Sequence, residues 1–368
     1  MGTPKIFNKK LTLGTLVNTT NRNNYFVYRK HGRCPKSMTM VSRSAFRISE
    51  VVIEISCVGI CGSDLKLYST GECGTVSVAG HPIVVGHEGA GTVVQVGSSV
   101  NNLSVGDRVA IEPTQPCRGC EYCKRGRYNL CAEPRYCSTR ECHGNLTKYY
   151  KHVADFCHKI PDNVSMEEGA AVQPLAIAIH ACRRAGVTLG ARVLVLGAGP
   201  VGVLCALTAR AMGAAKIMIT DVVQSRLDTA REMVADYTLL TSKMADEDVV
   251  GAVVDALGDN PDITIDACGF GDAQRVALMV TKTGGTVMVV GIGARSVELP
   301  LTAAMLREVD VRGANRLLNS YPIALAALES GAIDLKKFIT HHYPMERAKE
   351  AFECAKSGDA MKIIIHTK

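Results

Sequence analysis

Four cysteines, Cys117, Cys120, Cys123 and Cys131, lie in one short segment of the chain. Four thiolates at such spacings form a closed tetrahedral cage for a zinc ion and leave no coordination position for a substrate. Free or disulfide-bonded cysteines are the alternative interpretation. The N-terminal residues lack the apolar segment of a secretion signal, so we expect a reducing compartment in which disulfides are rare. The segment therefore predicts a structural zinc site.

A second set of metal-binding residue types consists of Cys61, His87 and Glu88. Glycines stand beside each of them and allow the tight backbone that would bring a thiolate, an imidazole and a carboxylate to one ion. Such a site keeps an open coordination position, as a catalytic zinc requires. A core cysteine and a His-Glu pair satisfied within a turn are the alternative interpretation of these residues taken alone.

A glycine pattern, Gly-x-Gly-x-x-Gly, is formed by Gly197, Gly199 and Gly202. It stands between the apolar, strand-like run 192–196 and a helical run that reaches about Met212. In that context the glycines let the backbone approach a pyrophosphate, and the helix N-terminus offers it free N–H groups. The pattern therefore predicts a dinucleotide site.

An acid follows at the end of the next strand-like run, 216–220, and this residue is Asp221. Its carboxylate would accept hydrogen bonds from the adenosine ribose and repel a 2′-phosphate, which favours NAD over NADP. Arg226 would either stack on the adenine or pair with Asp221, and a purely structural ion pair remains the alternative.

Strands and helices alternate from Thr188 onward, which predicts a doubly wound parallel sheet, or Rossmann domain. After Arg316 this alternation stops. The further predicted strands of the sheet are 237–240, 263–268, 286–290 and 311–313. The C-terminal part is predicted to form helices over 321–330 and 345–355 and a closing strand over 361–366 that rejoins the first domain. We interpret His341 and His342 as surface polar residues before a strand-like turn.

The N-terminal half contains short β-rich runs separated by Gly, Pro and Ser, which indicate an antiparallel, partly open barrel. These runs are 25–28, 38–41 and 51–55, and the third leads directly to Cys61. The first 24 residues are rich in Asn and Thr, and we interpret them as a tail or an added strand.

Composition excludes several classes of protein. The chain has 368 residues, 47% hydrophobic and 21% charged, which is typical of a globular protein and long enough for two domains. The net charge of +7 arises from the first 49 residues, which contain no Asp or Glu. The remainder is slightly acidic, which argues against nucleic-acid binding. No membrane span is evident. We expect a cytoplasmic protein, with a mitochondrial transit peptide as the alternative reading of the basic N-terminus.

The motifs Gly-Ile-Cys-Gly-Ser-Asp at 59–64 and Gly-His-Glu at 86–88, with the cysteine segment, resemble the zinc-containing medium-chain dehydrogenases. The resemblance covers residues 25–368 and is nearest to the sorbitol (polyol) dehydrogenase branch. It implies an α/β protein with a barrel-like (GroES-like) catalytic domain, residues 25–174 and 318–368, and a Rossmann coenzyme domain, 175–317. Residues 1–24 would be an N-terminal extension. The resemblance also implies a homo-oligomer, a tetramer, without nucleic-acid or membrane partners.

The same resemblance implies roles for individual residues. Zinc at Cys61, His87 and Glu88 would lower the pKa of a substrate hydroxyl, Ser63 would accept its proton, and hydride would pass to NAD. Two zinc ions per chain are therefore expected, one catalytic and one structural. The positions that contact NAD in relatives are occupied here by Pro200, Val201, Arg226, Val290, Gly291, Ile292, Ala314, Asn315 and Arg316.

Four residues depart from the pattern of the branch. Relatives carry Glu at the position of Gln173, Tyr at Leu67 and Leu317, and Phe at Asn315, whereas Arg316 keeps its identity. Fewer phenol hydroxyls at the substrate site favour a shorter or more apolar alcohol. Two alternatives to a polyol or secondary-alcohol dehydrogenase therefore stay open. One is a dehydrogenase of another hydroxy compound, and the other is a non-enzymatic NAD-binding descendant.

Overall fold

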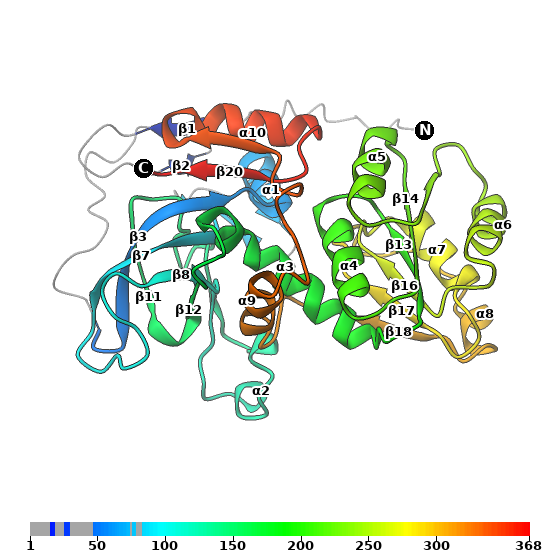
Figure 1. Cartoon of the computed structure of the whole chain (residues 1–368), viewed down its shortest axis with the longest axis horizontal. Coiled ribbons are helices and arrows are strands. Elements are labelled where there is room, and N and C mark those ends of the chain that lie inside the picture. Colours follow the sequence, from blue (N-terminus) through cyan, green and yellow to red (C-terminus); the bar gives the residue numbers. More distant parts are fainter. Residues whose placement is uncertain (1–14, 19–25, 30–46, 74–75, 79–82) are drawn as a thin grey trace, which may run out of the picture.

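Two domains lie on either side of the long helix α3 in the computed structural model, which describes residues 15–18, 26–29, 47–73, 76–78 and 83–368 (Figure 1). The predicted strand 38–41 lies outside the described residues. No helix in the described parts of the chain is both long enough and apolar enough to cross a bilayer.

The first domain is built on a seven-stranded sheet that is antiparallel except where its last two strands pair. Strand β3 (Glu50–Gly59) is buried along most of its length, with consecutive apolar residues on both faces, and it pairs with β7, β11 and β20 in the centre of the sheet. The other strands are β7 (Glu88–Val96), β8 (Arg108–Ile111), β11 (Tyr149–Val153), β12 (Cys157–Lys159), β19 (His341–Pro344) and β20 (Ile363–His366). The closing strand β20 pairs with β3 and so rejoins the first domain, as the sequence predicts.

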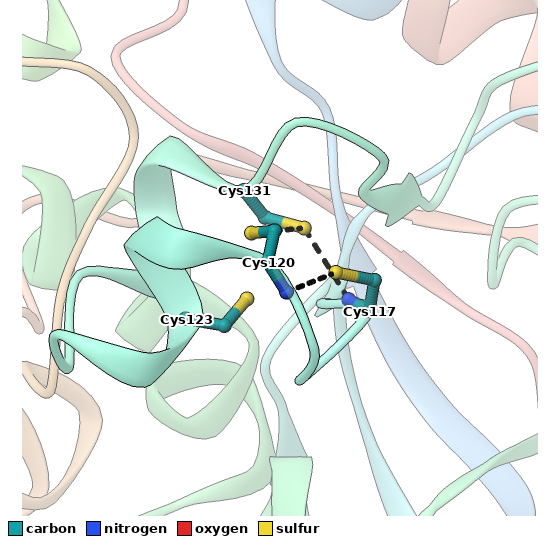
Figure 2. A group of neighbouring side chains, drawn as sticks. All are labelled: Cys117, Cys120, Cys123 and Cys131. Atoms are coloured by element: carbon teal, nitrogen blue, oxygen red, sulfur yellow. Dashed lines mark hydrogen bonds between the residues drawn. The ribbon is translucent and has the colours of Figure 1, made fainter.

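Short strands complete this domain. Residues 15–18, within the predicted extension, form strand β1, which pairs with β2 (Phe26–Arg29). The remaining short strands are β4 (Glu72–Cys73), β5 (Val76–Ser77), β6 (Ile83–Val84), β9 (Thr114–Gln115) and β10 (Arg135–Tyr136). A lobe between β9 and β10 carries the short helix α2 (Glu121–Lys124) and the four clustered cysteines (Figure 2).

The second domain is a six-stranded parallel sheet in the order β15-β14-β13-β16-β17-β18. The first strand in sequence, β13, lies in the middle, so the strand order reverses between β13 and β16, the place where such sheets bind ligands. The strands are β13 (Arg192–Leu196), β14 (Lys216–Asp221), β15 (Tyr237–Leu240), β16 (Ile263–Asp266), β17 (Thr286–Val289) and β18 (Asp310–Gly313). The helices are α4 (Pro200–Ala211), α5 (Gln224–Met233), α6 (Asp246–Leu257), α7 (Gly271–Val280) and α8 (Leu301–Met305).

The strand β16 ends two residues before its predicted end at Cys268. Its last residue, Asp266, accepts hydrogen bonds from the backbone N–H groups of Cys268 and Gly269 at 3.0 and 2.7 Å. The carboxylate thereby turns the chain away from the sheet, because it replaces the ladder partners that those N–H groups would otherwise have.

Helix α3 (Met166–Ala185) joins the two domains. A capping box starts it, with the Ser165 hydroxyl accepting from the Glu168 N–H and the Glu168 carboxylate accepting from the Ser165 N–H. Gly186, at φ 80°, ends it. The helix packs on β7 and β8 of the first domain and on α4 of the second. The predicted domain boundary at Pro174 falls inside this helix.

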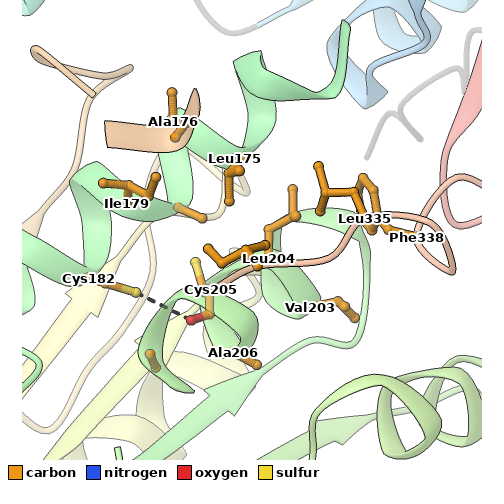
Figure 3. Close-up of a cluster of buried hydrophobic side chains, with 14 of the residues drawn as sticks. Leu175, Ala176, Ile179, Cys182, Val203, Leu204, Cys205, Ala206, Leu335 and Phe338 are labelled. Carbon is orange, nitrogen blue, oxygen red and sulfur yellow. Dashed lines mark hydrogen bonds between the residues drawn. The ribbon is translucent and has the colours of Figure 1, made fainter. Parts of the chain in front are cut away.

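A single hydrophobic core crosses from one domain to the other along α3. Leu175 and Ile179 of α3 belong to one cluster with Leu204 of α4 and with Phe338, and the Cys182 thiol donates to a carbonyl oxygen of α4 at 3.4 Å (Figure 3). The same cluster includes Ala90 and Ala110 of the first domain and Val193 and Ile217 of the second. Each fully buried Leu or Ile stabilises such a core by about 1.5 to 3 kcal/mol.

The C-terminal helices occur where the sequence predicts them, as α9 (Tyr321–Glu329) and α10 (Ala348–Ser357). A 3₁₀ turn, Met345–Arg347, precedes α10, since Pro344 fixes the entry into the helix. His341 and His342 begin strand β19, which pairs in parallel with β20, and the 3₁₀ turn follows at the end of that strand.

Candidate active site and zinc centres

The predicted catalytic ligands meet where β3 and β7 lie side by side. Cys61 is the N-cap of α1 (Gly62–Thr70), directly after β3, and Glu88 is the first residue of β7 and pairs with Gly59. His87 precedes Glu88. The ligand atoms of Cys61, His87 and Glu88 all lie within 4.8 Å of one another. The structure therefore brings together the three residues that the sequence predicts at a catalytic zinc.

Asp64 holds His87 in position. Its Oδ1 lies 3.3 Å from His87 Nδ1, and both residues are buried. The same carboxylate accepts hydrogen bonds from the Cys61 and Gly86 backbone N–H groups and from the Ser138 hydroxyl, at 3.3 to 3.4 Å. Because Nδ1 is engaged, Nε2 is the free ligand atom of His87. A carboxylate of this kind orients a metal-binding histidine and fixes its tautomer.

The two partners shift each other's pKa values. Burial raises the pKa of Asp64, but the charge and hydrogen bond of His87 and two backbone N–H groups outweigh it and lower that pKa below 3.8. For His87, burial lowers the pKa, whereas the charges of Asp64, Tyr136 and Cys61 together raise it well above 6.5.

Glu88 forms a buried ion pair that the sequence does not reveal. Its two carboxylate oxygens lie 2.7 and 3.0 Å from Lys362 Nζ, which also donates to the Ile60 carbonyl at 3.1 Å. The side chains of Lys362 and Glu88 are only 2% and 0% exposed. A Cβ at Gly59 would collide with the Glu88 carboxylate, so glycine is required there. No sequence signal pairs Lys362 with Glu88, since they are far apart in the chain.

Gln173 is buried near the same centre. Its Nε2 donates to the Tyr136 hydroxyl at 3.3 Å, and the Tyr136 ring centroid lies 5.8 Å from that of His87. The Gln173 Oε1 is buried without a hydrogen-bond partner among the described residues. A buried oxygen without a hydrogen-bond partner lowers the stability of the folded chain unless a ligand, a water molecule or a metal ion binds it. Together with a thiolate, an imidazole and a carboxylate, this orphaned oxygen makes a donor set that fits a zinc ion or its water.

The four clustered cysteines also converge. The sulfurs of Cys117, Cys120, Cys123 and Cys131 all lie within 4.8 Å of one another, and they face a common centre (Figure 2). The Cys117 N–H donates to Cys131 Sγ and the Cys120 N–H to Cys117 Sγ, both at 3.3 Å. Hydrogen bonds from the N–H groups of Ala132 and Cys123 lower the pKa of Cys120 to about 6. Four sulfurs without an open position fit a structural zinc.

The cysteine lobe reaches the coenzyme domain through Asn129. Its amide nitrogen donates to the Asn315 carbonyl at 3.1 Å, and the Asn315 amide nitrogen donates to the Asn129 carbonyl at 3.3 Å. The Tyr128 hydroxyl accepts from the Asn319 N–H at 2.9 Å. Between these contacts Arg316, with φ at 56°, places its guanidinium 4.7 Å from the centre of the Tyr136 ring.

The glycine loop has the geometry of a phosphate-binding turn. Gly197 has φ at 105°, and Gly199 is the N-cap of α4, with Pro200 at the first helical position and Val201 half-buried after it. A Cβ at Gly202 would collide with the Gly197 carbonyl oxygen, whereas one at Gly199 would meet open space. The free N–H groups at the start of α4 can therefore receive an anion that comes close to the backbone.

Asp221 lies at the end of β14, 8% exposed, on the rim of a pocket of about 760 Å³. Its Oδ2 accepts from the Ala198 N–H at 2.7 Å and its Oδ1 from the Val223 N–H at 2.9 Å. Arg226 lines the same pocket but donates to the Gly358 carbonyl at 3.5 Å, and no ion pair with Asp221 occurs in the described structure. The predicted structural pair with Asp221 is thus absent.

A smaller pocket of about 310 Å³ joins the two domains. Cys61 and Gly62 line one side, and Gly199, Pro200 and Arg226 line the other. The predicted metal ligand Cys61 and the predicted dinucleotide loop thus share one space. The predicted coenzyme residues Val290, Gly291 and Ile292 follow β17, and the Ile292 carbonyl accepts from Lys66 Nζ of α1 at 3.2 Å. Ala314, Asn315 and Arg316 follow β18 at the same sheet edge.

The other predicted site residues differ in exposure. Ser63 is half-buried in the first turn of α1. Leu67 and Leu317, predicted at the substrate site, are 4% and 2% exposed. Leu67 belongs to the core cluster of the first domain, and Leu317 belongs to the cluster that crosses both domains. Asp64 has a signal in the sequence, because it belongs to the Cys61 motif, whereas Tyr136 and Lys362 have none.

The chain matches two known protein families and is similar in sequence to a curated relative. Residues 47–162 match the family described as the alcohol dehydrogenase GroES-like domain, and residues 200–330 match the zinc-binding dehydrogenase family. A sorbitol dehydrogenase of Bombyx mori is 66% identical over 87% of this chain and 92% of the relative.

Solved structures are similar over nearly as much of the chain. An Escherichia coli oxidoreductase of unknown specificity has a TM-score of 0.82 at 33% identity, covering 88% of this chain and 93% of that one. An L-idonate 5-dehydrogenase from the same organism has a TM-score of 0.80 at 29% identity, covering 87% of this chain and 91% of that one.

Proposed function

The chain belongs to the zinc-containing medium-chain dehydrogenase family, and we propose from this premise that it oxidises a polyol or secondary alcohol with NAD and reduces the corresponding ketose or ketone. The matches confirm the predicted fold class, the enzyme class and the two cofactors, zinc and NAD. The observation that carries the proposal is the shared pocket in which Cys61 faces the Gly199 loop. Metal and coenzyme can meet there around one substrate carbon.

The residues of the chain have distinct tasks in this reaction. When bound by Cys61, His87 and Glu88, zinc supplies the Lewis acidity that acidifies an alcohol, and NAD supplies the hydride acceptor. Asp64 keeps His87 in one tautomer and one orientation. Ser63, two residues after Cys61, would accept the hydroxyl proton and pass it toward solvent.

Substrate choice would depend on the side chains around Arg316. Its guanidinium over Tyr136 stays able to donate to substrate hydroxyl groups. Leu67 and Leu317 present no hydrogen-bonding group, so a substrate hydroxyl directed at either one would lose its partner. We therefore propose preference for a short polyol or a simple secondary alcohol over a long, many-hydroxyl chain.

A substrate panel tests this function. NADH formation would be measured with sorbitol, xylitol, 2,3-butanediol and 2-propanol for the natural chain and for His87→Gln, which removes a metal ligand while keeping polarity. We expect turnover that His87→Gln reduces by at least a hundredfold, the range for loss of the metal. Equal inactivity of both proteins on every alcohol, with zinc present, would contradict the proposal and leave the two alternatives, a dehydrogenase of another hydroxy compound and a non-enzymatic NAD-binding descendant.

Preference for NAD over NADP is part of the proposal and rests on Asp221. The Asp221→Ala variant removes a ribose acceptor and a charge that repels a 2′-phosphate. We expect weaker NAD binding and a smaller discrimination against NADP, measured as dissociation constants by fluorescence titration of NADH and NADPH. Asp228→Ala, on the exposed side of α5, is the matched control that removes one carboxylate outside the pocket. A natural chain that already prefers NADPH would contradict this role.

We further propose a cytoplasmic homotetramer. The support is the large number of free cysteines, which suits a reducing compartment, and the resemblance to the polyol dehydrogenases. Light scattering coupled to size-exclusion chromatography would give the mass of the assembly, and a fluorescent fusion of the full chain would show whether residues 1–24 direct it to mitochondria. A monomer mass would contradict the proposed tetramer, and mitochondrial fluorescence would contradict the proposed cytoplasmic location.

A further inference from the structure

A third cluster of metal-binding side chains lies where strands β3 and β20 meet the start of α3. It consists of Cys57 of β3, His366 of β20 and Glu167 in the first turn of α3. The three ligand atoms lie within 4.8 Å of one another. Cys57 and His366 are direct partners in the antiparallel register, so their side chains share one face of the sheet. None of these residues takes part in the reaction derived above.

The spacing of the first two ligands matches a tetrahedral zinc. Zinc bonds of about 2.3 Å to sulfur and about 2.0 Å to nitrogen, at the tetrahedral angle, put the two ligand atoms about 3.6 Å apart. Cys57 Sγ and His366 Nδ1 are 3.6 Å apart. Glu167 is half-buried, and its long side chain can move the short distance needed to complete three protein ligands. The fourth position would be open to water.

His342 supports the cluster from outside. Its Nδ1 lies 3.0 Å from His366 Nε2, and the two rings stack with centroids 5.3 Å apart. A His366 Nε2–H that donates to His342 leaves Nδ1 without a proton, which is the tautomer that a metal ion requires at the Cys57 side. From the sequence we interpret His341 and His342 as surface residues. One of them, His342, orients His366, because β19 places it beside β20.

We propose that Cys57, Glu167 and His366 form a third zinc site, oriented by His342 and open to solvent on the His342 side. One thiolate and one carboxylate neutralise Zn²⁺, and the mixture of sulfur, imidazole and carboxylate is the donor set that zinc prefers. The ion ties the C-terminal strand β20 and the start of α3 to β3. Its role is therefore structural, and the reaction at Cys61 does not need it.

Zinc stoichiometry tests the site directly. The full chain would be treated with a mild chelator, equilibrated with buffered Zn²⁺, freed of excess metal and analysed by mass spectrometry of zinc. We expect three zinc ions per natural chain and two in Cys57→Ser and in His366→Gln, with NAD-dependent turnover unchanged in both variants. His341→Gln, on the opposite face of the same strand as His342, is the matched control and should keep three.

Further variants separate this site from the catalytic one. His87→Gln should also hold two zinc ions, and His87→Gln combined with His366→Gln should hold one, since the two losses are independent. His342→Gln should weaken binding of the third ion about 10- to 100-fold, the usual effect of removing a group that orients a ligand. If a variant of Cys57 or His366 fails to fold, cobalt titration of His87→Gln gives a second test. Co²⁺ bound to Cys57 would add thiolate charge-transfer absorption beyond that of the four-cysteine cage.

Two results would overturn the proposal. The first is a natural chain that saturates at two zinc ions, both retained in Cys57→Ser and His366→Gln. The second is a third ion that Cys57→Ser leaves bound with unchanged affinity, since that would place the metal on the exposed histidines alone. A natural chain that binds three zinc ions but turns over no alcohol of the panel would contradict the proposed function, whereas the proposal of a third zinc site would still hold.

Discussion

At the scale of single residues, the most consequential contact is the buried ion pair between Glu88 and Lys362. A carboxylate in this position has two possible partners, the ammonium group or the metal ion. The ammonium group compensates the Glu88 charge when the metal is absent, so the site can fold before zinc arrives. Removing one partner of a fully buried pair costs about 3 to 5 kcal/mol when nothing replaces it.

The Lys362→Met variant should therefore be destabilised much more without zinc than with it. Zinc bound next to Glu88 would supply the missing positive charge, so most of the loss, about 3 kcal/mol in the metal-free chain, should disappear on metal loading. The free energy of unfolding would be measured in urea with and without zinc. Lys362→Arg, which keeps the charge, is the control. Equal destabilisation in both metal states would show that Glu88 does not contact the zinc.

Gln173 allows a second prediction at this scale. Its unpartnered Oε1 and its bond to Tyr136 indicate a residue that adjusts the zinc environment without being essential to it. Gln173→Glu should change turnover by about tenfold or less, equivalent to about 1 kcal/mol. Steady-state rates on the best alcohol of the panel give the measurement, with Gln173→Ala as the comparison. Unchanged turnover in Gln173→Ala would mean that the residue has no part in the reaction.

The sequence predicts site residues well where one motif contains the ligand and its partner. Cys61 and Asp64 belong to a single motif, and the four zinc cysteines are neighbours in the chain. The sequence fails where the partner comes from another domain segment, as with Lys362 for Glu88 or Tyr136 for Gln173. Such pairs depend on strand register, in this case on the return of β20 beside β3, and no local pattern encodes that register.

At the scale of elements, the strand β13, the glycine loop and α4 form the unit that sequence patterns describe best. The bounds of β13 agree with the prediction because an apolar run defines the strand and glycines follow it. Pro200 then marks the start of α4. By contrast, β19 is short and polar, and it exists only because β20 offers a partner, so the pattern of His341 to Pro344 indicates no strand by itself.

Two glycines of this loop should respond differently to alanine. Gly202→Ala forces a Cβ into the Gly197 carbonyl oxygen, so we expect both a lower melting temperature and weaker NAD binding. The methyl group of Gly199→Ala would meet no other atom of the protein, so this variant should keep the melting temperature of the natural chain. It should lose NAD affinity, because the methyl group stands where the pyrophosphate approaches. Thermal scans with and without NAD separate the two effects. Normal melting of Gly202→Ala would contradict the steric argument.

At the scale of the whole molecule, the cysteine lobe connects a metal centre to the coenzyme domain. Asn129 and Asn315 exchange two hydrogen bonds, and Arg316 follows directly. Removal of the structural zinc would free the lobe and, with it, the segment that positions Arg316. We therefore expect the lobe to act on the cleft through these backbone contacts.

The core that follows α3 across both domains has a consequence for how the chain loses its structure. Two domains with wholly separate cores can melt one after the other. Each half of this chain has a core cluster of its own, but a further cluster is shared, since Ala90 and Ala110 belong to it together with Val193 and Ile217, and α3 passes through both halves. Neither half can open without exposing apolar surface of the other. We therefore expect one cooperative heat-absorption peak, with calorimetric and van't Hoff enthalpies in a ratio of about one. Two resolved peaks in scanning calorimetry, or a ratio near two, would mean that the halves melt independently and that α3 breaks near Pro174 before the rest of the molecule does.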